Sequence, residues 1–87
     1  MALLKPDPQL ELAARVRRFV VDNFYVPDGA ALGDETSLIE SGIVDSTGVL
    51  ELIAFLEAEF GVAVADAEVT PDNLETIGRI ARYVAGK

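Results

Sequence analysis

The sequence predicts an all-α fold of four helices, three longer and one short, with a long loop between the first helix and the second. Apolar residues recur at helical spacing in three segments, and no segment alternates apolar and polar residues long enough to make a convincing strand. Residues that favour helix ends stand at the borders of these segments. A chain of 87 residues with 51% hydrophobic content suits one core. We therefore expect a single domain over residues 1–87, ordered from about 8 to about 85.

The first helix is expected to begin at Asp7-Pro8, because aspartate caps a helix well and proline suits the first helical position. The residues that follow at helical spacing are Leu12, Val16, Phe19, Val20 and Asn23. This helix ends in the run from Phe24 to Gly29, and residues 27–44 form a long loop. Loops of this length in small domains are usually functional or pinned to the core. The apolar residues that could anchor this loop are Leu32, Leu38, Ile39 and Ile43.

The second helix should run from about Asp45 to Phe60 and end at Gly61, since glycine is favoured just past a helix. Its core face is expected to contain Val49, Leu52, Ile53, Leu56 and Phe60. The stretch Val62 to Val64 is too short for a strand and is interpreted as an extended connection. A single-turn helix is expected to open at Thr70-Pro71-Asp72-Asn73. The last helix should start near Glu75-Thr76 and bury Ile77, Ile80, Ala81 and Val84.

The charge of the chain is strongly acidic and unevenly distributed. The net charge is −8, from 15 acidic against 7 basic residues, and no Lys or Arg lies between Phe19 and Gly78. Thirteen acidic residues lie in that stretch. Such a surface repels nucleic acid and anionic lipid and attracts basic protein partners, although it could also serve solubility alone. We therefore expect no nucleic acid or membrane partner, and a monomer.

The composition also excludes several kinds of chemistry. There is no Cys and no His, so disulfides and the commonest general base and metal ligand are missing. The residues around Ser46 do not form a Gly-x-Ser-x-Gly pattern, and no calcium loop or phosphate-binding glycine pattern is present. We expect neither an enzyme nor a metal site. The first residues do not form a signal-peptide core and no apolar run reaches membrane-spanning length, which predicts a cytoplasmic location.

The run Gly42-Ile43-Val44-Asp45-Ser46 lies where the long loop meets the second helix. Asp45 is placed to cap that helix, which leaves Ser46 in its first turn. Free N–H groups and the positive end of the helix dipole favour a phosphate attached there, without any basic side chain. An enzyme could also reach a short side chain at this position. The alternative is that Asp45 and Ser46 only cap the helix.

The run from Thr36 to Ser46 resembles the signature of acyl and peptidyl carrier proteins. The resemblance continues from Val49 to Gly61 and from Thr70 to the last helix, so it covers nearly the whole chain. It implies a four-helix carrier in which a phosphopantetheinyl transferase attaches 4′-phosphopantetheine from coenzyme A to Ser46, and Asp45 helps to place the metal used in that reaction. The arm would hold an acyl or aminoacyl group as a thioester, loaded by a ligase and used by downstream acyl-processing enzymes. The only thiol would then come from the arm, which fits the absence of Cys.

The second helix departs from the pattern of fatty-acid carriers. A large apolar residue usually follows the modified serine, where this chain has Thr47, and two positions that are often acidic hold Gly48 and Ala58. We therefore favour a carrier for an adenylating ligase in nonribosomal peptide or polyketide synthesis. The outward residues expected to contact partner enzymes are Thr47, Leu50, Glu51, Ala54 and Glu57. The alternative is an acidic helical interaction module without a prosthetic group.

Overall fold

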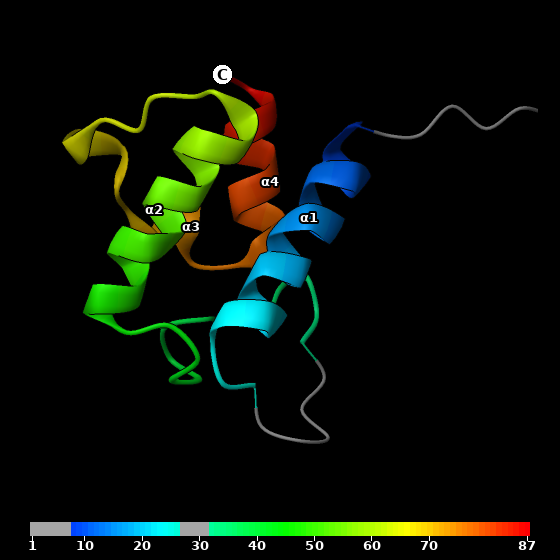
Figure 1. The fold of residues 1–87 in the computed structure, drawn as a ribbon, viewed down its shortest axis with the longest axis vertical. Coiled ribbons are helices and arrows are strands. Elements are labelled where there is room, and N and C mark those ends of the chain that lie inside the picture. The colour runs from blue at the N-terminus through cyan, green and yellow to red at the C-terminus, as the bar shows by residue number, and fades with distance from the viewer. Residues whose placement is uncertain (1–7, 27–31) are drawn as a thin grey trace, which may run out of the picture.

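The computed structural model describes residues 8–26 and 32–87, and these form the predicted all-α fold of four helices (Figure 1). The helices are α1 (Pro8–Asn23), α2 (Ser46–Phe60), α3 (Pro71–Leu74) and α4 (Ile77–Ala85), with one 3₁₀ turn, η1 (Asp66–Glu68). The described ranges contain no strand. Within those ranges, no helix is both long enough and apolar enough to span a membrane. The predicted cap Asp7 lies outside the described residues.

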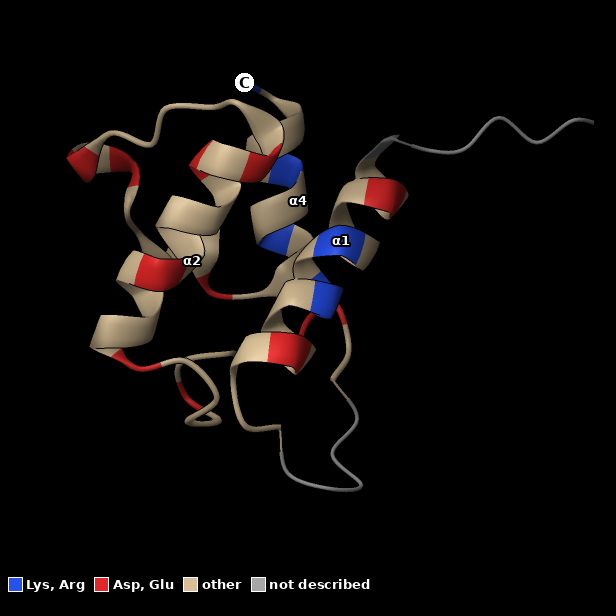
Figure 2. Cartoon of the chain, in the orientation of Figure 1, with Lys and Arg blue, Asp and Glu red and all other residues tan. Residues whose placement is uncertain are grey.

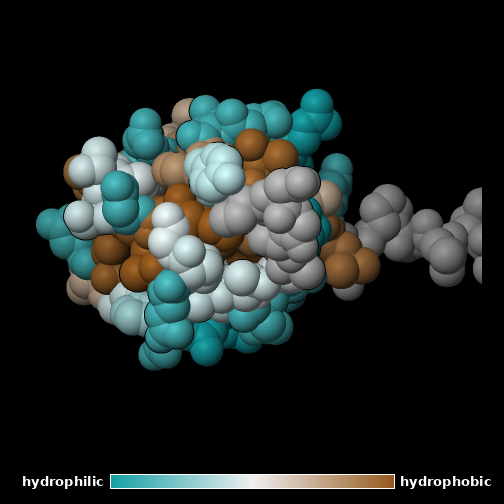
Figure 3. Space-filling model, turned by 90° about the horizontal axis from the view of Figure 1, so that it is seen from below, coloured by the Kyte–Doolittle hydropathy of each residue, from teal (hydrophilic) through white to brown (hydrophobic). Residues whose placement is uncertain are grey.

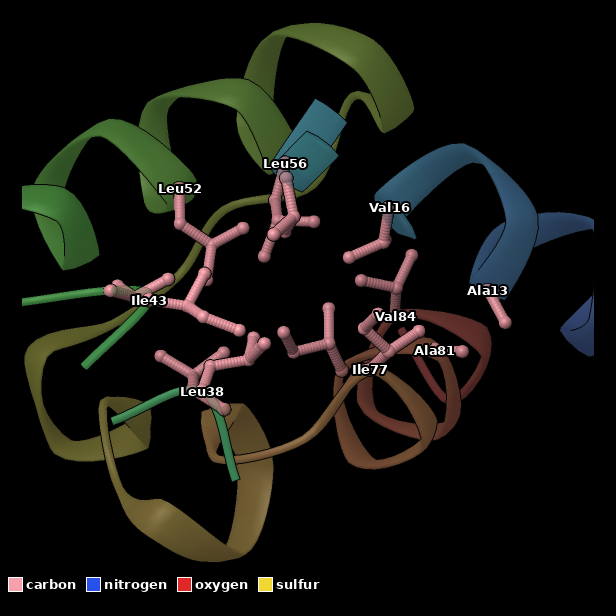
Figure 4. Packing of buried hydrophobic residues seen from close by; sticks show 13 residues of the cluster. Ala13, Val16, Leu38, Ile43, Leu52, Leu56, Ile77, Ala81 and Val84 are labelled. Atoms are coloured by element: carbon pink, nitrogen blue, oxygen red, sulfur yellow. The ribbon is translucent and has the colours of Figure 1, made fainter. Parts of the chain in front are cut away.

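The core forms where α1, α2, α4 and the loop before α2 meet (Figure 4). Helices α1 and α4 make the most extensive contact between two helices. The prediction for α4 is confirmed, because all four of its expected core residues are buried. In α1, Val16 and Val20 are buried as expected, together with Ala13, which the pattern did not single out. Asn23 is exposed instead, and its side-chain amide donates to the Phe19 carbonyl of the same helix.

The loop before α2 is pinned to the core, but not by all the residues that were expected. Leu38 and Ile43 are buried, and Leu32 packs partly against the core. The prediction was wrong for Ile39, which is 47% exposed, because the chain turns at Leu38 and places the next side chain outward. Val44, which was not expected to anchor the loop, is 1% exposed.

Backbone hydrogen bonds fix this loop against the start of α4. The Leu38 N–H donates to the Glu75 carbonyl at 2.9 Å, and the Val44 N–H donates to the Leu38 carbonyl at 2.9 Å. Upstream, the Gly78 N–H donates to the Asp34 carbonyl at 2.8 Å. The Arg17 guanidinium of α1 contacts the Asp34 carboxylate and the Leu32 carbonyl. The polypeptide that leads to Ser46 is therefore held at both of its ends.

The segment between α2 and α3 contains an unpredicted turn, η1, that is held by one carboxylate. Glu68 Oε1 accepts hydrogen bonds from the Lys87 Nζ at 2.8 Å, the Tyr83 hydroxyl at 2.7 Å and the Ala65 N–H at 3.1 Å. These donors, led by Lys87, lower the pKa of Glu68 from its usual 4.5 to about 2. The short helix α3 begins after Thr70 as expected, but the Thr70 side chain makes no capping bond.

This depressed pKa predicts a pH-dependent contribution to stability. A carboxylate whose pKa is lowered by folding stabilises the folded state above its unfolded pKa, and this contribution is lost as pH falls from 4.5 to about 2. The difference in melting temperature between the wild type and Glu68→Gln should be largest above pH 4.5 and should vanish near pH 2. Thermal melts followed by circular dichroism over this range measure it. The exposed Glu51→Gln is the control, and a difference for Glu68→Gln that does not change with pH would contradict the assignment.

Candidate functional site

The first turn of α2 places Ser46 at the surface. Asp45 occupies the N-cap position with extended backbone, and its Oδ1 accepts from the Gly48 N–H at 2.7 Å. Ser46 follows as the first helical residue, and its side chain is exposed. The N–H groups of Ser46 and Thr47 lie at the helix start, where no preceding turn supplies a carbonyl. A hydroxyl at this point is open to an enzyme and sits in a field that favours a phosphate.

The sequence-predicted recognition residues lie together on the outward face of α2. Thr47, Leu50, Glu51 and Ala54 are all exposed, and Leu50 is 68% exposed. Since residues three and four apart share a helix face, Leu50 lies one turn beyond Ser46 on the same side. Glu57 is also exposed, but its carboxylate accepts from the Val64 N–H at 3.0 Å. Glu57 therefore also holds the segment that follows α2.

An open groove of about 380 Å³ runs beside this face. Its walls combine the loop before α2, α2 itself and the segment around α3; the lining residues are Ile39, Glu40, Val49, Val69, Thr70, Pro71, Leu74 and Glu75. Seen from the side of the molecule where α2 begins, apolar side chains reach the surface between hydrophilic ones (Figure 3). Sequence reasoning missed Ile39 and Val69 as surface residues, because neither lies in a periodic segment that would assign it a face.

The charges around the site have one sign. Helix α2 and the described segments on either side of it carry acidic residues and no Lys or Arg, whereas the basic residues in the described part of the chain lie on α1, α4 and the last residue (Figure 2). Most of these bases are paired with acids, as in Arg15 with Glu59 at 3.1 Å and Arg79 with Glu75 at 3.3 Å. The exposed start of α2 therefore presents net negative charge to an approaching protein.

The prosthetic group can be accommodated at this position. An attached phosphodiester needs an exposed hydroxyl and hydrogen-bond donors nearby, and the first turn of α2 offers both. Within residues 8–26 and 32–87, no three His, Cys, Asp or Glu side chains gather in a way that could hold a metal ion. The Asp45 carboxylate is exposed and uses one oxygen for its cap, so the other oxygen can still contact a metal brought by a partner enzyme.

Comparison with known proteins agrees with this geometry. A family profile described as "Phosphopantetheine attachment site" matches residues 14–84. A D-alanyl carrier protein of Streptococcus thermophilus is 32% identical over 65 residues, which cover 75% of this chain and 81% of that protein. An acyl carrier protein of Thermotoga maritima is 30% identical over 77 residues, which cover 88% of this chain and 91% of that protein.

Proposed function

This chain belongs to the phosphopantetheine attachment-site family of carrier proteins, which bear a covalent 4′-phosphopantetheine, and we propose that Ser46 is the residue that bears it. The observation that supports this assignment best is the exposed Ser46 side chain at the first residue of α2, directly after the Asp45 cap. When bound, the group supplies a thiol on a flexible arm, and an acyl or aminoacyl cargo is held there as a thioester.

Two residues of this chain act in the attachment. The Ser46 hydroxyl oxygen forms a P–O bond to the phosphopantetheinyl phosphorus of coenzyme A. The P–O bond to the nucleotide half of coenzyme A breaks, and the hydroxyl proton leaves to a base of the transferase. Asp45 holds the first turn of α2 through its bond to the Gly48 N–H and helps to place the metal that the transferase uses. The start of the helix then stabilises the negative charge of the phosphodiester.

The cargo is an acyl or aminoacyl group activated by an adenylating ligase. One relative that matches most of the chain is named a D-alanyl carrier protein, which supports an aminoacyl cargo. The outward face of α2 is less acidic than a face made for electrostatic docking alone, since Leu50 and Ala54 are exposed beside Glu51. An apolar centre with a charged rim suits a small transient interface with each partner enzyme. The transferase, the ligase and the downstream acyl-processing enzymes would all approach this face.

The mass of the intact protein tests the proposal directly. Purified apo-protein incubated with coenzyme A, Mg²⁺ and a broad-specificity transferase should gain one phosphopantetheine, and a thiol reagent should then label it. The unmodified chain has no Cys, so any labelled thiol must come from the arm. A protein that gains no mass under conditions that modify a known carrier would refute the function. It would leave an acidic interaction module as the explanation of the fold.

The recognition face gives a further prediction. Leu50→Asp should lower kcat/KM of the transferase for the apo-protein by about tenfold, about 1.4 kcal/mol, because a charge replaces an apolar contact beside Ser46. Circular dichroism should show an unchanged helix content, since Leu50 lies outside the core. Val21→Asp is a matched control, because Val21 is an apolar residue of α1, not of α2, and is 52% exposed. Equal losses in the two variants would remove this face from the recognition surface.

A further inference from the structure

Gly48 lies in the first turn of α2, two residues after Ser46, and it is buried. An ideal Cβ at this position would lie 2.7 Å from Phe24 Cε1, closer than side chains can approach without a shift. The same Cβ would lie 3.2 Å from Val44 Cγ1 and 3.3 Å from Asp45 Oδ1. Glycine is unfavourable inside a helix, and here it permits the close approach of a ring, a methyl group and the capping carboxylate.

Phe24 is the first of a row of aromatic rings that contact one another. Its ring meets Phe19 edge to face, with centroids 5.8 Å apart. Phe19 stacks on Phe55 at 4.1 Å, and Phe55 meets Phe60 edge to face at 5.8 Å. These four rings form a continuous row along the seam between α1 and α2. Edge-to-face and stacked rings stabilise one another, so displacing the Phe24 ring costs free energy, and we expect a side chain added at position 48 to shift the start of α2.

The Gly48 position is also coupled to Asp45. The Gly48 N–H donates to Asp45 Oδ1 at 2.7 Å, and that same oxygen is one of the atoms that a Cβ would crowd. We propose that Gly48 and Phe24 are a positioning pair, which sets where the Asp45 carboxylate lies beside the Ser46 hydroxyl during phosphopantetheine transfer. This inference rests on the proposed function of Ser46. It concerns geometry alone, since neither Gly48 nor Phe24 provides a group that reacts.

The test measures the transferase reaction with apo-protein variants. Gly48→Ala should lower kcat about tenfold, because small displacements of groups near a reacting centre are costly, while KM changes less than twofold. In a Phe24→Leu background, which removes the Cε1 atom, Gly48→Ala should lower kcat less than threefold relative to Phe24→Leu alone. Gly86→Ala is the matched control, because a Cβ there makes only ordinary contacts, the nearest at 3.6 Å, and kcat should not change.

The outcomes separate this inference from the proposed function. Wild-type protein that is modified at Ser46, together with a Gly48→Ala variant of wild-type kcat, would overturn the positioning role and leave the function intact. An equal loss from Gly48→Ala in both backgrounds would overturn the role of Phe24. Circular dichroism checks the fold of each variant. If Gly48→Ala loses helicity, Phe24→Trp serves as the second variant, because it places a larger ring against the unchanged glycine. Phe24→Trp should lower kcat in the same way. An unchanged kcat in this variant would overturn the proposal.

Discussion

Ser46→Ala should abolish phosphopantetheine attachment completely while the domain stays folded. The substitution removes the only oxygen that the proposed reaction can join to phosphorus. It leaves the Asp45 cap in place, since that cap uses the Gly48 N–H. Ser46 is exposed, so the change in the free energy of unfolding should be under about 1 kcal/mol. Intact mass after reaction with coenzyme A and a transferase measures the first effect, and thermal melting measures the second.

The other serines near the motif provide the internal control. Ser37 Oγ donates to the Glu75 carboxylate at 2.8 Å and accepts from the Glu40 N–H at 3.1 Å, so its hydroxyl is already used in holding the loop. Ser41 Oγ donates to the Leu38 carbonyl at 3.3 Å. We therefore expect Ser37→Ala and Ser41→Ala to be modified as fully as the wild type. A Ser46→Ala protein that still gained one arm would show that the attachment site lies elsewhere.

The parts of the fold that could be predicted from sequence are those determined by neighbouring residues. Asp45 and Gly61 mark the ends of α2, because a capping carboxylate and a left-handed glycine act within one turn. The four buried residues of α4 follow from spacing alone. The same local pattern placed Asp45 and Ser46 at the start of α2, but it left simple capping open, and Ser46 was identified as the candidate attachment site through the resemblance to carrier proteins.

Interactions between distant segments could not be predicted in this way. The hydrogen bonds of Glu68 to Tyr83 and Lys87 join residues 15 and 19 positions apart, and no local pattern indicates them. The contact between Phe24 and Gly48 joins the end of α1 to the start of α2. A glycine inside a helical pattern was the one available signal, because it often has a packing reason. In the loop before α2, apolar residues without a period gave no means of telling Leu38 from Ile39.

Truncation of Leu38, the buried neighbour of Ile39, has the largest expected effect on stability. Leu38→Ala should lower the free energy of unfolding by about 2–5 kcal/mol, because it opens a cavity in a fully buried position. The total free energy of unfolding of a native protein is roughly 5–15 kcal/mol, so this substitution would remove a large part of it. In thermal melts, the melting temperature should fall by about 10 °C or more. The loop should loosen as well, since the Leu38 backbone bonds to Glu75 and Val44 depend on its position.

Ile39→Ala is the matched control, since it removes a side chain of the same size one residue away. Ile39 is 47% exposed and lines the open groove beside α2, so its loss leaves no closed cavity. We expect a change of under about 1 kcal/mol in the free energy of unfolding. Urea denaturation of both variants, followed by circular dichroism, measures the two values against the wild type. Equal destabilisation by the two substitutions would mean that both side chains anchor the loop, as the sequence alone suggested. Ile39 would then not be available to partner enzymes on the surface beside Ser46.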